Sequence, residues 1–247
     1  MDAQRKAGVL DSGIQSHMAR MRRSSWLAGW MQDALRSGLL RAYRRVRVDP
    51  DQYLRRVRRA HRLPICSWDD MFLLRQEFVD QAAQETIAAA SKMAALEGAG
   101  LGLGGMLTLV PDLGVLATLT VRMLQKLSLL HGFSYSTDEE TAQLWLAAAT
   151  AAGVNLGRQW FEKEAVERFV PRAIERIAVK LGAEAAEKWT CRVLPVVSGA
   201  LGGAMNYWFV REWGCRSRRY FREKHLQARA VVRVSPIEMS KRPRPQG

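Results

Sequence analysis

Residues 98–121 form an apolar stretch, GAGLGLGGMLTLVPDLGVLATLTV, whose 24 residues include six glycines and one charged side chain. Glycines four positions apart, such as Gly98 and Gly102, leave one side of a helix without side chains, so a second backbone can approach closely. The later segment VLPVVSGALGGAMNYWFV repeats this spacing at Gly199 and Gly203. The two glycine-lined helix faces predict helices that pack on each other at the centre of the fold.

Pro111 and Asp112 divide the apolar stretch. Proline is favoured in the first turn of a helix, and an aspartate there meets the positive end of the helix dipole. We therefore predict a helix, a tight turn and a second helix that ends at Gly132, directly after His131.

Residues 25–47 carry apolar side chains every three to five positions, which predicts an amphipathic helix with arginines on its opposite side. Asp49 as N-cap and Pro50 at the first helical position predict a second helix, which stops at Pro64. The two make a basic helical hairpin. The predicted apolar side of the first helix consists of Trp26, Trp30, Leu35, Leu39, Tyr43 and Val46.

Helical signals continue through the middle of the chain. A third helix is predicted over residues 69–96, polar on one side, alanine-rich on the other and ending where the glycines begin. Thr137 and Glu140 stand three residues apart as in a capping box, which predicts the start of the helix that contains LWLAAATAAG.

The C-terminal half also favours helices. Two helical pieces are predicted over residues 160–181, joined at Pro171, followed by a piece over residues 183–192. A long final helix is predicted from near Pro195, emerging as the basic segment REWGCRSRRYFREKHLQAR. A short VVRV near residue 232 carries nearly all of the strand signal in the chain.

The expected fold class is therefore all-α. We predict a helical bundle with glycine-rich apolar helix hairpins at its centre, a basic amphipathic N-terminal hairpin and a basic C-terminal helix. The predicted divisions are a flexible N-terminus over residues 1–24, the hairpin over 25–64, a helical domain over 65–230 and a C-terminal tail over 231–247, which ends in SKRPRPQG and is expected to be disordered.

Charge is distributed unevenly along the chain, whose net charge is +14. Residues 1–65 carry an excess of +10 and residues 211–247 an excess of +8, whereas residues 66–150 carry −6 and residues 151–210 carry +2. Basic ends attract phosphate, on a membrane leaflet or on nucleic acid, and charge alone does not choose between the two.

The three cysteines, Cys66, Cys191 and Cys215, are an odd number without CxxC spacing, so reduced thiols in a cytosolic setting are expected. The first twenty residues contain no apolar run typical of a secretory signal, and Asp2 excludes N-myristoylation. We expect a cytoplasmic protein, peripheral to the inner face of the membrane.

The order of the motifs LEGAGLGLGG, TLVPDLGVLATLTVRMLQKLSLLHGF, an acidic helix start and VLPVVSGALGGAMNYWF before a basic helix resembles the EcsC family of helical proteins. The resemblance extends over residues 52–226, and His131 stands where the family usually has a tyrosine. It implies a helical fold and a membrane neighbourhood, since the family is named after a component encoded beside an ABC transporter, but it supplies no reaction. The residues that fit the family motifs are Glu97, Gly98, Gly102, Gly105, Pro111, Asp112, Leu113, Gly132, Pro195, Gly199, Gly202, Gly203 and Asn206.

Chemical motifs are scarce. GLGLGG at residues 100–105 matches GxGxxG, but a predicted helix precedes it and no acidic residue stands about twenty positions on, so no dinucleotide cofactor is expected. HExxH, GxSxG and P-loop motifs are missing from the sequence. Cys191, Cys215 and His225 lack the spacing of a zinc site, so no metal is expected.

The remaining acids and histidines have plain structural interpretations. Glu97 and Asp112 are a candidate carboxylate pair, although acids at helix ends usually act as a cap and a dipole partner. The four histidines share no motif, and His61 and His225 lie in basic segments, where a solvated side chain is expected.

Two segments approach the length of a membrane span. The leucines and valines of residues 98–121 favour membrane insertion by about 4.5 kcal/mol, and Asp112 opposes it by about 3 kcal/mol. Because the glycines add nothing favourable, a membrane span is not expected. Residues 193–210 are 18 uncharged residues beside Trp208 and Trp213, for which a buried core helix and a short span are the alternatives.

We therefore expect a non-catalytic helical module, with no cofactor, that associates with an anionic membrane surface or a membrane protein complex, as an accessory factor of a transport system. The alternatives are a hydrolase-like enzyme that uses Glu97 and Asp112, and non-specific nucleic-acid binding through the basic ends. A membrane module is expected to place its tryptophans and arginines on one surface. The predicted membrane-binding residues are Trp26, Trp30, Arg41, Arg44, Arg45, Arg216, Arg218 and Arg219.

Overall fold

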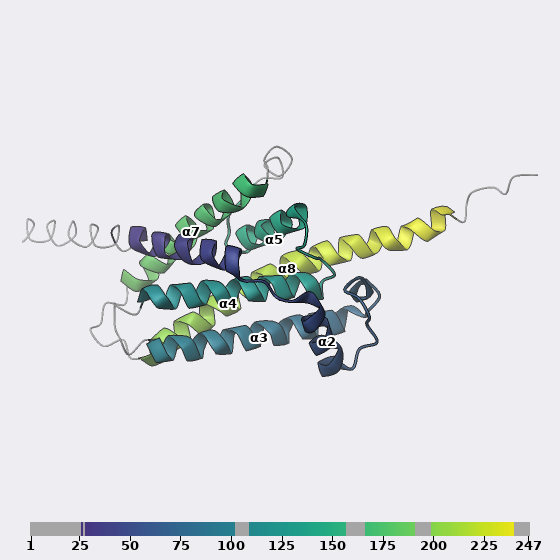
Figure 1. Ribbon diagram of the computed structural model, residues 1–247, viewed down its shortest axis with the longest axis horizontal. Helices are drawn as coiled ribbons and strands as arrows, with labels where there is room; N and C mark the ends of the chain where they lie inside the picture. Colours follow the sequence, from purple (N-terminus) through teal and green to yellow (C-terminus); the bar gives the residue numbers. More distant parts are fainter. Residues whose placement is uncertain (1–25, 27, 102–108, 157–165, 191–198, 240–247) are drawn as a thin grey trace, which may run out of the picture.

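The computed structural model describes residues 26, 28–101, 109–156, 166–190 and 199–239. These residues fold into helices and connecting segments, with no strand among them, so the predicted all-α class is confirmed. An N-terminal helix, residues 28–45 with Trp26 also helical, precedes the labelled elements (Figure 1). These are α2 (Pro50–His61), the 3₁₀ helix η1 (Asp69–Phe72), α3 (Gln76–Leu101), α4 (Leu109–Leu130), α5 (Asp138–Ala151), α7 (Val166–Thr190) and α8 (Gly199–Met239).

Helices α3 and α8 make the most extensive helix–helix contact, and α4 lies antiparallel beside α3 (Figure 1). A Cβ atom at Gly203 of α8 would lie 2.6 Å from the carbonyl oxygen of Ala95 and 3.3 Å from the Cβ atom of Ala99 on α3. The predicted close approach at a glycine face is therefore present at Gly203. Of the glycine face predicted to pack on it, Gly98 lies in α3 and Gly102 lies outside the described residues.

The N-terminal helix buries Leu35 and Leu39 in the core, and Val46, directly after the helix, is buried as well. Beyond its end the side-chain amide of Gln125, on α4, binds the backbone twice: its oxygen accepts from the N–H of Val48 at 3.0 Å and its nitrogen donates to the carbonyl of Val46 at 2.9 Å. These bonds attach the segment that leads into α2 to the surface of α4.

Capping chemistry sets several helix ends as predicted. The Asp49 carboxylate accepts from the N–H of Gln52 at the start of α2, where Pro50 stands at the first helical position. Thr137 and Glu140 form the predicted capping box of α5. After α4, Gly132 adopts φ +79°, and a Cβ atom there would lie 2.4 Å from the ring of Phe72, so both conformation and space require glycine.

The predicted third helix, residues 69–96, is wrong at both ends. The Asp70 carboxylate accepts from the N–H groups of Cys66 and Ser67 at 2.7 and 2.9 Å, which holds the preceding segment against the short 3₁₀ helix η1, and α3 begins separately at Gln76. At the other end α3 continues through Gly98 to Leu101, because packing against α8 stabilises a helix that glycine alone weakens.

The predicted break at Pro171 is also wrong, because α7 continues through both Pro171 and Gly182. Proline inside a helix costs about 3 kcal/mol, and the neighbouring Val170 and Ile174, both with 0% exposure, supply the burial that offsets it. The VVRV segment near residue 232 lies inside α8 and not in a strand, since adding residues to a formed helix is easier than starting a strand alone. Residues 240–247 lie outside the described part.

Within the described ranges, no helix combines the length and apolarity needed to cross a bilayer. Part of each candidate span, residues 102–108 and 193–198, falls outside those ranges.

Candidate functional site

Helices α2, α3 and α4 enclose a groove of about 360 Å³, which we call the α2 groove. The basic helix α2 crosses over the antiparallel pair α3 and α4 and buries Tyr53 and Val57 against it. Side chains from all three helices line the groove, namely Tyr53, Arg56, Val57, Ala60, His61, Ala82, Glu85, Thr86, Ala89, Ala90, Met93, Leu119, Arg122, Met123 and Lys126.

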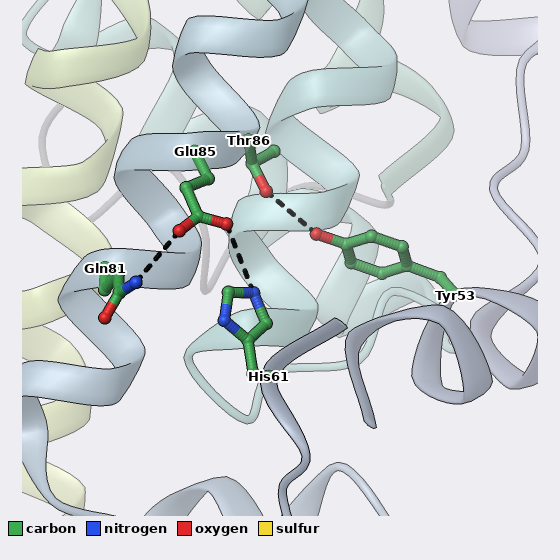
Figure 2. Close-up of polar contacts among 5 residues, drawn as sticks. All are labelled: Tyr53, His61, Gln81, Glu85 and Thr86. Carbon is green, nitrogen blue, oxygen red and sulfur yellow. Dashed lines mark hydrogen bonds and ion pairs between the residues drawn. The ribbon is translucent and has the colours of Figure 1, made fainter. Parts of the chain in front are cut away.

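Two polar contacts fix α2 onto α3 (Figure 2). The hydroxyls of Tyr53 and Thr86 are hydrogen-bonded at 3.0 Å. His61 Nε2 lies 3.5 Å from Glu85 Oε2, and the other oxygen of Glu85 accepts from the amide of Gln81 at 3.0 Å. The expectation of a solvated His61 is wrong, because only 15% of its side chain is exposed.

Three cationic side chains converge on the groove: Arg56 from α2, and Arg122 and Lys126 from α4. Lys126 Nζ lies 5.4 Å from the centre of the Tyr53 ring. Burial, and then the charges of Arg56 and Arg122, lower the pKa of Lys126. In the described part of the chain, no carboxylate lies within 4.0 Å of these three cations, so positive charge is concentrated there without a matching anion.

The Tyr53 phenol is held in its neutral form. Burial raises the pKa of Tyr53 to about 12, and this outweighs the opposite effects of the Thr86 hydrogen bond and the Arg56 charge. The ring also stacks on Trp68, with 5.5 Å between ring centres. Tyr53 is thus a structural side chain of the groove and not a base near neutral pH.

The groove becomes apolar along α3 and α4. Met93 lies two helical turns beyond Thr86 on α3, and Leu119 lies two turns before Lys126 on the antiparallel α4, so both are displaced in the same direction (Figure 1). Met93 is 48% exposed. The groove therefore joins a cationic end to an apolar end.

The predicted membrane-binding residues of the N-terminal helix lie differently from the expectation. Trp26 is 63% exposed and Trp30 is half-buried against the core, so the prediction that both share the apolar side with Leu35 is wrong for Trp26. Because a helix has about 3.6 residues per turn, positions 26, 30, 41 and 44 fall on one side, where Arg41 and Arg44 are exposed. Arg45 is exposed on a neighbouring line.

The three predicted arginines of α8 do not form one face. Arg216 and Arg219 are exposed, and Arg216 pairs with Glu212 at 2.9 Å. Arg218 is half-buried, and its Nε atom has no hydrogen-bond partner in the described part of the chain. Nothing in the described residues joins these arginines to those of the N-terminal helix.

The described family-motif residues lie at several places in the fold and do not line the α2 groove. Glu97 is exposed on α3 and does not line the α2 groove, whereas Gly98 beside it is buried. Pro111 and Asp112 lie in the first turn of α4, and Asn206 is half-buried on α8. The structure describes no side-chain surroundings for Asp112, so the carboxylate pair stays a prediction. Gly199 and Gly202 lie in α8, while Gly102, Gly105 and Pro195 fall outside the described residues.

The structure also brings together two histidines that the sequence leaves unconnected. His131 and His225 both have 0% exposure, and their ring centres are 5.9 Å apart. The expectation of a solvated His225 is therefore wrong: its Nδ1–H donates to the carbonyl of His131 at 2.9 Å, and its ring stacks on Phe72. Burial lowers the pKa of His131 to about 4 and also lowers the pKa of His225.

Among the described residues, no three histidine, cysteine or acidic side chains are close enough to hold a metal ion. His131, directly after α4, and His225 on α8 are buried in the core, whereas the α2 groove carries accessible positive charge.

The sequence profile of the EcsC protein family matches residues 51–226, from the first turn of α2 to the middle of α8. The chain belongs to the EcsC protein family. A relative of this family, Protein EcsC of Bacillus subtilis (strain 168), is 28% identical over 163 residues, which cover 61% of this chain and 65% of the relative. The chain thus matches less than two thirds of the relative's length, and no solved structure gives a significant match.

The α2 groove of this EcsC family protein was not predicted from the sequence, although the placement of a few basic residues indicates part of it. Residues 66–150 have an excess of acidic side chains and contain only four basic ones. Two of these four, Arg122 and Lys126, stand four positions apart on α4 and face the basic helix α2. Isolated cations placed on one side of an apolar helix are the pattern that indicates this end of the groove.

Proposed function

We propose that this EcsC family protein is a non-catalytic helical module that associates peripherally with an anionic membrane surface, on the cytoplasmic face. The observation that carries the proposal is the position of Trp26, which is 63% exposed on the same side of the N-terminal helix as Arg41 and Arg44. An accessory role beside a membrane transport complex is consistent with this placement and is part of the proposal.

The physical argument rests on combining the two kinds of side chain. Basic residues near an anionic leaflet contribute about 1 kcal/mol each, and a tryptophan inserts its ring at the level of the lipid headgroups. Nucleic-acid phosphate provides the charge but no apolar boundary, so an exposed tryptophan among arginines favours lipid. Trp30 packs partly on the core and contributes mainly to the fold.

Flotation with liposomes tests the proposal. The protein is expected to float with anionic liposomes at low salt, to bind neutral liposomes poorly and to be partly released by salt, because the contact is electrostatic in part. Trp26→Ala should weaken flotation while leaving binding to duplex DNA nearly unchanged, since that binding depends on charge, and Arg41→Glu with Arg44→Glu should weaken both.

Leu73→Ala is the matched control, since Leu73 is another large apolar side chain, 77% exposed, that lies outside the N-terminal helix. It should float like the parent. A protein that ignores anionic liposomes at low salt but binds nucleic acid at micromolar concentration would overturn the membrane proposal and establish the nucleic-acid alternative.

A further inference from the structure

We propose that the α2 groove binds one anionic phospholipid molecule, with its phosphate on Arg56, Arg122 and Lys126 and an acyl chain over Ala90, Met93 and Leu119. The proposal deepens the membrane function proposed above and rests on it. It assigns a defined ligand site to a surface that charge alone would describe only as basic.

The cationic end has the composition of an anion site. Three positive side chains from two helices face one space, and like charges that lie together repel one another until an anion joins them. The acidic lining residue Glu85 makes no ion pair with any of the three, and its oxygens contact His61 and Gln81 instead (Figure 2). Arginine donates paired hydrogen bonds to phosphate, and lysine adds a compact charge.

The apolar end selects a lipid over a free phosphate or a nucleotide. The lining changes over two helical turns from Thr86 and Lys126 to Met93 and Leu119, which have no charged groups. A base would need an open aromatic face, but the Tyr53 ring already stacks on Trp68 and carries Lys126 over it. An alkyl chain needs only the apolar surface that is present.

The dimensions fit a partly enclosed lipid. The groove volume of about 360 Å³ lies near the lower limit of ligand sites, which run from about 300 to 1,000 Å³. It accommodates a headgroup and part of one chain. Beyond Met93, the next large apolar side chain on α3 is Leu96, which is 69% exposed and extends the apolar surface toward solvent or a bilayer.

Methionine methyl NMR on the full chain provides a direct test. The probe is a short-chain phosphatidylglycerol kept below its micelle concentration, so that no membrane is present. The methyl signals of the groove residues Met93 and Met123 are expected to shift saturably, whereas those of Met31 and Met71, which are buried outside the groove, should not. Met93→Leu and Met123→Leu assign the signals.

Charge variants test the assigned phosphate contacts. Arg122→Gln combined with Lys126→Gln should lower the affinity for the lipid about tenfold or more, the loss expected when charge-assisted hydrogen bonds are removed. Arg58→Gln is the matched control, because Arg58 is an exposed arginine of α2 that does not line the groove. It should bind like the parent, and an unfolding curve for each variant separates loss of binding from loss of fold.

Headgroup and chain controls decide the ligand class. Phosphatidylcholine of the same chain length should bind more weakly, and so should glycerol phosphate, which has the anion without the chain. Equal affinity for glycerol phosphate would overturn the lipid assignment in favour of a free phosphate site. Shifts of Met93 and Met123 that survive the Arg122 and Lys126 substitutions, or no shifts at all, would overturn the proposal outright.

The two proposals fail in different experiments. Monomeric lipid reports on the groove, whereas flotation of Trp26→Ala reports on the N-terminal helix. Parent protein that binds the short-chain lipid but not anionic liposomes would overturn the surface proposal and retain the site. Parent protein that floats but shows no groove shifts would do the reverse.

Discussion

Acidification is expected to destabilise the protein through its buried histidine pair. His131 has 0% exposure, and burial, as the largest cause, lowers its pKa from 6.5 to about 4 in the folded protein. Arg218 and His225 lower it further, while Asp80 and the hydrogen bond to the Leu127 carbonyl act in the opposite direction. The folded protein therefore holds this imidazole neutral.

The sign and size of the effect follow from proton linkage. In the unfolded chain the imidazole takes up a proton below its ordinary pKa of about 6.5, whereas the folded protein does so only below about 4. The stability contributed by neutral burial is complete above about pH 6.5 and is lost as the pH falls between these two values. At about 1.4 kcal/mol per pKa unit, His131 accounts for about 3 kcal/mol, and His225, whose pKa is also lowered, adds to it.

Urea unfolding followed by circular dichroism, at a series of pH values from about 7 to about 4.5, measures this loss. The range stops above the ordinary pKa values of carboxylates, about 4, so that groups such as Asp70 stay ionised. Backbone N–H groups of Ser67 and Cys66 lower the pKa of Asp70. The free energy of unfolding should fall by about 2 to 3 kcal/mol over this range.

Asparagine provides the matched substitution, because its amide nitrogen retains a donor near the position of Nδ1, which in His131 lies 2.7 Å from the Leu127 carbonyl oxygen. His131→Asn should lower stability at pH 7 but flatten its dependence on pH, and adding His225→Asn should flatten it further. A parent protein whose unfolding free energy is constant over this range, or whose slope survives both substitutions, would refute the reasoning.

Two further predictions concern packing and capping. Gly203→Ala should lower the free energy of unfolding by about 1 to 3 kcal/mol, because the new Cβ would lie 2.6 Å from the Ala95 carbonyl oxygen; Gly29→Ala, with no atom within 4 Å of its Cβ, is the control and should not destabilise. Equal unfolding midpoints for the two would contradict the close contact. Thr137→Ala should cost about 1 kcal/mol by removing the N-cap of α5, and an unchanged urea midpoint would contradict a role for the capping box.

Local chemistry explains which parts of the fold the sequence predicted. The start of α2 at Asp49, the start of α5 at Thr137 and the end of α4 at Gly132 each depend on residues within a few positions of one another. Such short-range hydrogen bonding can be predicted from residues that are neighbours in the sequence. Boundaries that depend on a distant partner were predicted wrongly, as where α3 passes Gly98 and α7 passes Pro171.

The candidate site was hidden for the same reason. Tyr53 and Thr86 are 33 positions apart, and His131 and His225 are 94 positions apart, so no local pattern joins either pair. The three-to-five-residue spacing also assigned Trp26 to the apolar side of its helix. At 3.6 residues per turn, however, Trp26 lies opposite Leu35, and its exposure in the structure agrees with that placement.

The pairing of α3 with α8 imposes an order on folding during synthesis. The ion pair between Asp80 and Arg222 spans 142 positions, and the most extensive contact of α3 is made with a helix that begins at Gly199. A chain folds from its N-terminal part as it leaves the ribosome, but the contacts between α3 and α8 cannot form until α8 has been synthesised. The apolar side of α3 is therefore uncovered through most of translation, when a nascent chain is most open to chaperones. A protein cut short before α8 has no native cover for α3, and is expected to aggregate or to be degraded.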